Sequence, residues 1–476
     1  MSEKYDAILI GAGMSGLAAG IRLAQYDKRV LILERHYLWG GLNSFYKRRG
    51  RIFDVGLHAL TNFAPKGRRG VPLTKLLRQL RIRHSDLKLG EQNYSEIAFP
   101  TERLRFSNEF ELFESEIARA FPGQVDGFAK LTEAIFAYDS FTPPDPDLLA
   151  RGELAKFITE PLLVEMLMLP MCYYGSAIPG DIAWYQFAIL FKSFYDEGFA
   201  RPEGGIRPLL DLLVKRYKSL GGELRMKSGV AEILQQGSGD LRCAAGVRLE
   251  NGEEIMADQV LSSAGYGPTM EMCGAELGAK VTDQDRGQLS FNETVIVTDK
   301  TPMDFGNYGA AITFFNDSDS FDYSCPAPGG LGIDTRSGVI CSPNNYAAAE
   351  PLTHGWMRFT ALASAGHWEG LAAKDAAEYE TQKQHSAQAF LDSAARFAPD
   401  PRPFEIERDL FTPNTIKRFC GHPKGAVYGA PKKRLDGATE LPGLFLMGTD
   451  QGLLGVVGAM LSGISMANRH CLQPTA

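Results

Sequence analysis

The chain has 476 residues. A single hydrophobic core stops growing at roughly 250–300 residues, so we expect more than one domain. Hydrophobic residues make up 44% of the sequence and charged residues 22%, as in an ordinary globular protein. The net charge of −7 is spread without long charged runs, which argues against a nucleic-acid partner because such proteins need a clustered basic face.

The seven cysteines are scattered, odd in number and without a CxxC pair. This pattern is unlike a disulfide framework or a zinc site and is typical of a reducing compartment, so we expect no metal and a cytoplasmic location. The opening MSEKYDAILIGAG reaches its glycines too soon for the apolar core of a signal peptide. The sequence has no window of roughly 18 uncharged apolar residues, so we expect no membrane-spanning helix.

The clearest structural unit covers residues 5–34. The apolar strand AILIG is followed by Gly11, Gly13 and Gly16 in GxGxxG spacing, then by a helix rich in small residues and the strand RVLILE, which Glu34 ends. In this context the glycines permit a tight turn, close approach of a pyrophosphate and close packing of helix on strand. The helix N-terminus offers N–H groups to phosphates, and the glutamate can bind ribose hydroxyls. The unit predicts a dinucleotide-binding site.

The middle of the chain alternates between helix and strand signals. Residues 206–265 predict a helix that stops at Gly221, a strand–turn–strand segment and a hairpin at Asn251-Gly252. Residues 286–365 are rich in strand patterns and predict a mixed or antiparallel sheet. The segment AAKDAAEYETQKQHSAQAFLDSAARF then predicts one long amphipathic helix.

Residues 110–200 are predicted to be mostly helical, with Met and aromatic side chains dense between 162 and 195. This density favours an apolar ligand tunnel or a membrane-facing lid, with ordinary core packing as the alternative. The candidate tunnel residues are Phe136, Phe141, Leu167, Met168, Met171, Tyr173, Tyr174, Trp184, Phe187, Phe191 and Phe194.

The C-terminal block repeats the opening pattern. The strand LFLMG leads through Asp450 and a glycine-rich turn into the helix VVGAMLSGISMANRH. Such a turn at a helix N-terminus predicts a second site for a phosphate or a polar ring, although close packing alone would also explain the glycines.

Together these blocks resemble the FAD-dependent amine-oxidase-like superfamily, and within it the phytoene desaturase, carotenoid isomerase and retinol saturase group. The resemblance covers nearly the whole chain, is weak between 100 and 200, and rests on the motifs IGAGMSGLAAGIRLA, GGLNSF, GRIFDVGLH, RPEGGIRPLLDLL, TPNTIKRFCGHPKGAVYG and GTDQGLLGVVGAMLSG.

The resemblance implies an α/β fold. A Rossmann-like FAD-binding domain, a parallel sheet with helices, would be discontinuous and cover 1–75, 205–285 and 415–476. A discontinuous α+β substrate domain with a mixed sheet would cover 76–204 and 286–414, and its helical part, 110–200, would form a lid that faces a membrane.

The resemblance also implies a set of FAD-binding residues. Val230 would lie beside the adenine, Asp450 would meet the ribityl chain or the pyrophosphate, and the segment with His58 would run past the isoalloxazine ring. The implied cofactor-binding residues are Gly11, Gly13, Ser15, Gly16, Glu34, Arg35, Gly40, Gly41, Gly56, Leu57, His58, Val230, Gly448, Asp450, Gly455, Val456 and Val457.

One position departs from the relatives. Many of them carry an arginine directly after the second glycine pair, where this chain has Leu42 and Asn43. A cationic contact near the cofactor is therefore missing here or comes from Lys47 or Arg51.

Several residues are candidates for the chemistry. His58 is the candidate catalytic residue, because its ordinary pKa suits proton transfer near neutral pH; a packed core histidine and a flavin contact are the alternatives. His422 ranks below it. Glu165 and Asp181 could stabilise a cationic polyene, or lie on solvated helix faces.

The leading hypothesis is an FAD-dependent oxidoreductase that desaturates, saturates or isomerises an apolar polyene such as a carotenoid or its precursor, by hydride transfer with flavin N5. It would bind an apolar small molecule, associate peripherally with a membrane and have no nucleic-acid partner. A flavin amine oxidase and a non-catalytic prenyl-binding relative are the alternatives.

Overall fold

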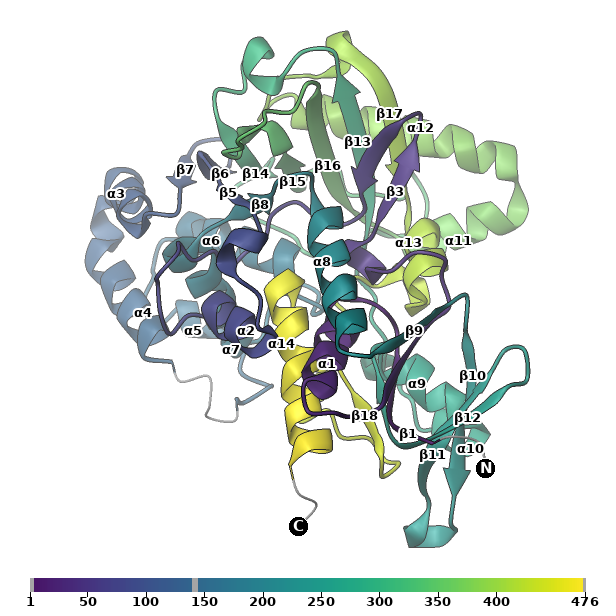
Figure 1. Ribbon diagram of the computed structural model, residues 1–476. Helices are drawn as coiled ribbons and strands as arrows, with labels where there is room; N and C mark the ends of the chain where they lie inside the picture. The colour runs from purple at the N-terminus through teal and green to yellow at the C-terminus, as the bar shows by residue number, and fades with distance from the viewer. Residues whose placement is uncertain (1–3, 139–143, 474–476) are drawn as a thin grey trace.

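The structure is a computed structural model that describes residues 4–138 and 144–473, and two seven-stranded sheets organise it (Figure 1). The strands of the first sheet are β1 (Tyr5–Ile10), β2 (Val30–Glu34), β9 (Glu223–Met226), β10 (Val230–Gln236), β11 (Cys243–Leu249), β12 (Glu254–Ser262) and β18 (Leu444–Leu446). They run in the order β10-β11-β12-β1-β2-β9, with β18 beside β12. All pairs are parallel except β10–β11 and β11–β12, so the predicted βαβ unit and the predicted hairpin are confirmed.

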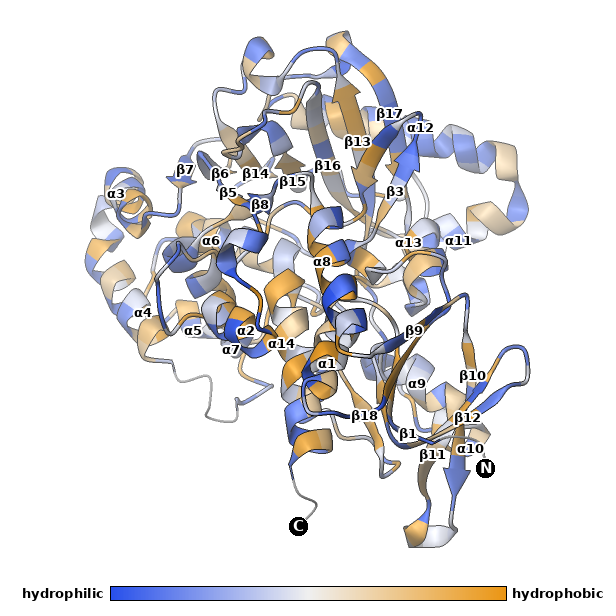
Figure 2. Cartoon of the chain, in the orientation of Figure 1, coloured by the Kyte–Doolittle hydropathy of each residue, from blue (hydrophilic) through white to orange (hydrophobic). Residues whose placement is uncertain are grey.

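The central parallel strands β1 and β2 are almost fully buried and largely apolar, as expected for strands covered on both faces. Helices α1 (Met14–Ala24) and α14 (Gly455–Ala467) pack against each other beside it (Figure 1). Both are coloured largely as hydrophobic in Figure 2, whereas the exposed helix α12 (Ala376–Ala394) is largely hydrophilic. A Cβ atom on Gly463 would lie 2.0 Å from the carbonyl oxygen of Ser15, so glycine is required for the two helices to approach this closely.

The second sheet is mixed, as predicted, because β14–β6 is parallel and the other pairs are antiparallel. Its strands are β6 (Tyr94–Ala98), β7 (Arg103–Phe106), β13 (Ser290–Thr298), β14 (Ala310–Asn316), β15 (Ser337–Cys341), β16 (Gly355–Ala363) and β17 (Glu405–Phe411), in the order β17-β13-β16-β15-β14-β6-β7. Two small sheets join β3 (Phe45–Arg48) to β4 (Arg51–Asp54), and β5 (Leu89–Glu91) to β8 (Ala200–Pro202).

The predicted helical region is confirmed. It contains α3 (Phe110–Ala120), α4 (Val125–Ala137), α5 (Ala150–Leu154), α6 (Pro161–Gly175), α7 (Trp184–Phe191) and the π-helical turn η4 (Lys192–Glu197). The other helices of four or more residues are α2 (Pro72–Leu80), α8 (Ile206–Ser219), α9 (Tyr266–Met272), α10 (Ala275–Gly278), α11 (Ala365–Lys374) and α13 (Pro413–Cys420), with a four-residue 3₁₀ turn at Pro302–Phe305 and the terminal π turn Asn468–Leu472. In the parts of the chain that the structure describes, no helix is long and apolar enough to cross a membrane.

The predicted single long helix between β16 and β17 is wrong at its start. Asp375 separates α11 from α12, because its backbone is extended and its side chain accepts hydrogen bonds from the N–H groups of Ala377 (2.8 Å) and Glu378 (3.1 Å). An aspartate in this position caps a helix rather than continuing one.

Candidate functional site

A cavity of about 1570 Å³ is lined by residues from both large sheets and from α1, α7 and α14. A typical site for one small ligand measures roughly 300–1,000 Å³. The cavity therefore has room for a large cofactor and a second molecule.

One end of the cavity is a cradle formed by the two glycine motifs. Gly11 has φ +102°, and a Cβ atom there would lie 2.2 Å from Oγ of Ser263. Gly13 bridges to Gly40, yet a Cβ atom on Gly13 would meet nothing closer than the Gly40 carbonyl oxygen at 4.0 Å. This open space lies at the N-terminus of α1, where no side chain caps the helix. Free N–H groups at such an end fit a pyrophosphate.

Glu34 stands beside this cradle at the end of β2. Its carboxylate accepts hydrogen bonds from the N–H groups of Ala12 and His36, both at 2.8 Å, and lies in the cavity wall. Nε2 of His36 is buried and has no partner within the described residues. The fixed carboxylate retains lone pairs for ribose hydroxyls, so the residues at this end fit the adenosine half of a dinucleotide.

Most of the predicted cofactor residues lie in the cavity wall. They are Gly11, Gly13, Ser15, Glu34, Arg35, Gly40, Gly41, Gly56, His58, Val230, Gly448, Gly455 and Val456. As far as the structure describes it, the wall does not include Gly16, Leu57, Asp450 or Val457. A Cβ atom on Gly16 would lie 2.0 Å from the carbonyl oxygen of Gly11, so this glycine serves the packing of helix on strand.

Asp450 faces the protein rather than the cavity. Its carboxylate accepts hydrogen bonds from the N–H groups of Tyr266 (2.7 Å) and Ala430 (2.8 Å), which ties the start of α9 and the loop at Ala430 to the turn before α14. Its contact with the cofactor stays a prediction. Of the two cations suggested in place of the missing arginine, Lys47 lines the cavity, whereas Arg51 is paired with Glu407 at 2.9 Å.

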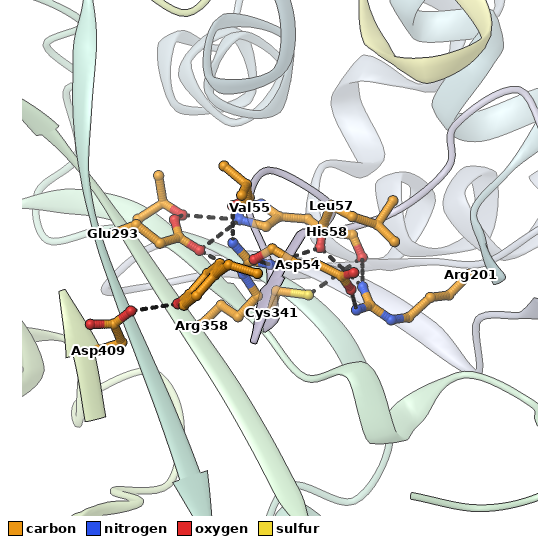
Figure 3. A network of polar contacts seen from close by, with 11 residues as sticks. Asp54, Val55, Leu57, His58, Arg201, Glu293, Cys341, Arg358 and Asp409 are labelled. Atoms are coloured by element: carbon orange, nitrogen blue, oxygen red, sulfur yellow. Dashed lines mark hydrogen bonds and ion pairs between the residues drawn. The ribbon is translucent and has the colours of Figure 1, made fainter. Parts of the chain in front are cut away.

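Two arginines hold the segment from Asp54 to His58 (Figure 3): Arg358, which is buried, and Arg201, whose side chain is 12% exposed. Arg358 donates to the carbonyl oxygens of Asp54 (3.1 Å), Val55 (2.5 Å) and Leu57 (3.2 Å). Arg201 donates to the carbonyl oxygens of Leu57 (3.0 Å) and His58 (3.1 Å), and pairs with the Asp54 carboxylate. Because a guanidinium presents its donors in a rigid plane, the two arginines fix this segment at the cavity wall.

His58 is linked to the second sheet through Glu293 (Figure 3). Its Nε2 lies 3.3 Å from Oε1 of Glu293 and 3.2 Å from Oγ1 of Thr360. Arg358 Nε donates to the same Glu293 oxygen at 2.6 Å. Burial raises the pKa of Glu293, but the charges of Arg358 and His58 and the hydrogen bonds it accepts outweigh burial and lower it to about 2. The carboxylate is therefore ionised, and it orients the imidazole at the cavity wall.

Beside His58, whose ring centroid lies 6.0 Å from that of Tyr174, part of the cavity wall is apolar. The residues lining this part are Tyr173, Tyr174, Ile189, Leu190, Phe291, Val339, Val427 and Tyr428. Of the described candidate tunnel residues, Tyr173 and Tyr174 line the cavity, and their contact with an apolar ligand stays a prediction. Most of the other candidates, Leu167, Met168, Met171, Trp184, Phe187, Phe191 and Phe194, are buried in the hydrophobic core of the helical region. Phe136 is exposed, and Phe141 lies outside the described residues.

Sequence reasoning missed the apolar wall contributed by the second sheet. Phe291 and Glu293 are two residues apart on β13, so they lie on the same face of the strand, and both line the cavity. The sequence predicts that they share a face, but it does not show that this face meets the cavity.

Of the remaining candidates for the chemistry, His422 lines the cavity, whereas Glu165 and Asp181 do not. Glu165 pairs with Arg151 at 2.8 Å, and Asp181 accepts from the N–H group of Ile182 at 2.8 Å; neither lines the cavity. His422 lines it and is buried, and burial lowers the pKa of its imidazole.

Comparisons with known proteins agree with this geometry. Residues 14–271 match the family described as flavin containing amine oxidoreductase. The chain is 25% identical to prolycopene isomerase 2, chloroplastic, of an Oncidium hybrid cultivar, over 98% of this chain and 84% of that protein. It is 23% identical to the all-trans-retinol 13,14-reductase of Danio rerio, over 97% and 85%. A neurosporene-forming phytoene desaturase of Rhodobacter capsulatus is 27% identical, over 55% and 53%.

Solved structures show the same fold at low sequence identity. An oxidoreductase from Methanosarcina mazei superposes with a TM-score of 0.65 at 15% identity, over 96% of this chain and 99% of the other. Wild-type putrescine oxidase bound to putrescine gives 0.61 at 15% identity, over 99% and 100%. The predicted α/β fold and the predicted FAD cofactor are confirmed. The chain belongs to the flavin containing amine oxidoreductase family and is an FAD-dependent oxidoreductase.

Proposed function

We propose that the protein acts on an apolar, conjugated isoprenoid and changes the configuration or the saturation of one of its double bonds. The observation that carries this proposal is the apolar compartment that continues the cofactor cavity past His58, between aromatic side chains of α6 and β13 and the loop with Tyr428. An extended hydrocarbon can lie against such a wall, and removal of its apolar surface from water favours binding.

The similarity to relatives supports the same substrate class. The prolycopene isomerases and the retinol reductase match over nearly the whole chain, whereas the phytoene desaturase matches over about half of it. Isomerisation or saturation is therefore better supported than desaturation.

When bound, FAD supplies hydride exchange, and the protein orients the substrate and shields the reacting atoms from water. The hydrogen bonds from Arg358 hold the backbone around Gly56 in the cavity wall. His58, oriented by Glu293, can hold or release a proton at Nδ1, which makes no hydrogen bond within the described residues. The apolar side chains of the wall beside it disfavour water there.

We further propose that the substrate enters from a membrane surface. Phe136, Leu148 and Leu149 are exposed apolar side chains, and the last two lie beside the start of α7, whose Ile189 and Leu190 line the cavity. Replacing all three with serine is expected to reduce sedimentation with phospholipid vesicles. Unchanged sedimentation would contradict the membrane proposal and leave the substrate proposal intact.

Separate titrations with two kinds of ligand test the substrate class. Oxidised holoprotein is titrated with a polyene in detergent micelles and, separately, with alkyl diamines, and the flavin absorption spectrum is followed. We expect the polyene to shift the flavin bands and the diamines to have no effect. Anaerobic bleaching of the flavin by diamines alone would show an amine oxidase instead.

A further inference from the structure

A second group of polar side chains lines the cavity outside the network around His58. Asn62, Ser193 and Glu197 have exposed fractions of 9%, 1% and 6%, and all three belong to the cavity wall. Asn62 Nδ2 donates to Oε2 of Glu197 at 3.0 Å. The Ser193 hydroxyl is buried and has no hydrogen-bond partner within the described residues.

The three polar side chains come from two segments with unusual backbone conformations. Ser193 and Glu197 lie on the π-helical turn η4, and such turns are rare and occur frequently at functional sites. Asn62 has φ +63°, a left-handed conformation that costs energy for a residue other than glycine. Its N–H group donates to the carbonyl oxygen of Ser193 at 3.4 Å, which joins the two segments.

The polar group of Asn62, Ser193 and Glu197 lies next to an apolar part of the cavity wall. Ile189 and Leu190, which form part of the apolar wall, come just before Ser193 in the chain, where α7 passes into η4. The polar group thus follows directly on an apolar stretch of wall. This arrangement matches a molecule with a long apolar body and one polar end.

The chemistry of the three side chains matches a hydroxyl. Asn62 and Ser193 can both donate and accept, and Glu197 accepts when ionised and donates when protonated. Burial raises the pKa of Glu197 to about 7, although the hydrogen bond from Asn62 and the charges of Arg68 and Lys192 oppose this. The carboxyl group can therefore be neutral near neutral pH, which suits an uncharged partner better than an ammonium ion.

We propose that Asn62, Ser193 and Glu197 bind the terminal hydroxyl group of an oxygenated isoprenoid, so that the protein selects polyene alcohols over polyene hydrocarbons. This proposal rests on the proposed function and names the substrate class within it.

Binding of two matched ligands tests the proposal without turnover. Oxidised holoprotein is titrated with a polyene alcohol and with the same polyene lacking its hydroxyl, and the shift of the flavin bands gives each Kd. We expect the alcohol to bind at least ~10-fold more tightly, the factor that corresponds to the hydrogen bonds one hydroxyl makes. Ser193→Ala and Glu197→Leu are expected to remove this preference, and Glu197→Gln, which keeps its hydrogen bonds, to retain most of it.

Val339→Ala is the matched control, because it changes the apolar wall and is expected to weaken both ligands equally. The flavin spectrum and circular dichroism of each variant show whether it is folded. Equal affinity of the wild type for the two ligands would overturn the hydroxyl site while the substrate class stands. Failure of both polyenes to bind would overturn the proposed function as well. Tighter binding of an alkyl ammonium than of the alcohol would show that Asn62, Ser193 and Glu197 bind an amine, and would overturn the hydroxyl site.

Discussion

Arg358 and Glu293 form a buried ion pair, with Nε of the arginine 2.6 Å from Oε1 of the glutamate. Each partner also makes a second contact, since the arginine holds the backbone of residues 54–57 and the glutamate orients His58. The pair thus connects the second sheet to the segment that lines the cofactor cavity. This connection could not be read from the sequence, because Arg358, Glu293 and the segment 54–57 lie far apart along the chain.

Breaking the pair tests its structural role. Arg358→Met leaves an uncompensated buried carboxylate and several buried carbonyl groups without donors, so we expect it to lower the free energy of unfolding by about 3–5 kcal/mol. Urea denaturation monitored by circular dichroism measures this. The double variant Arg358→Met/Glu293→Gln is expected to recover part of the loss, because it removes the stranded charge. A single variant as stable as the wild type would contradict the role.

Replacement of His58 tests whether this residue transfers a proton or only makes a hydrogen bond to Glu293. His58→Gln can keep a hydrogen bond to Glu293 but cannot exchange a proton near neutral pH. We expect normal FAD content and a kcat lowered by about 100-fold, the lower range for loss of a general acid or base. Turnover of the variant at the wild-type rate, measured with the polyene substrate, would remove His58 from the catalytic residues.

Glu34 is predicted to bind the ribose of the cofactor. Glu34→Gln removes the charge that strengthens its hydrogen bonds, and such bonds contribute about 1.5–3 kcal/mol. We expect the Kd for FAD to rise by about 10-fold or more, measured by quenching of flavin fluorescence. Glu254→Gln, an exposed position on β12, serves as the control and is expected to leave the Kd unchanged. An unaltered Kd in the Glu34 variant would contradict its role.

The titration of Glu197 gives a prediction about pH. Burial raises the pKa of this carboxyl from 4.5 to about 7 in the folded protein. The folded state therefore keeps a proton that the unfolded state has lost, and the resulting stabilisation is full below pH 4.5 and disappears as the pH rises through 7. The difference corresponds to about 3 kcal/mol.

Glu197→Gln has no such titration. We expect its free energy of unfolding to fall less than that of the wild type between pH 5 and pH 7.5, by about 2 kcal/mol, because part of the full difference already appears below pH 5. Chemical denaturation at several pH values measures both proteins. Parallel pH profiles would show that the carboxyl does not titrate in this range.

The sequence predicted the cofactor half of the site well, for a physical reason. Gly11, Gly13 and Glu34 act through local backbone geometry within one βαβ unit, so their spacing carries the information. The apolar half depends on which faces of α6, α7 and β13 meet after folding. The dense Met and aromatic residues predicted a tunnel, yet most of them pack in a hydrophobic core. Composition alone does not distinguish a residue that lines a cavity from one that is buried in a core.

The polar group at Asn62 shows the same limit. No spacing rule links this residue to Ser193 and Glu197, and they meet because a left-handed turn and a π-helical turn lie side by side. By contrast, the break at Asp375 was visible, since an aspartate before Ala-Ala-Glu is a common helix start.

The central claim is that the protein rearranges or saturates a double bond of a polyene. Its most direct test is chromatography of a cis-configured polyene in liposomes after anaerobic incubation with holoprotein whose flavin has been reduced. We predict a product with altered configuration or with one double bond fewer, which forms with reduced holoprotein and not with protein stripped of FAD. An unchanged polyene, together with rapid flavin reduction by simple amines, would contradict the claim.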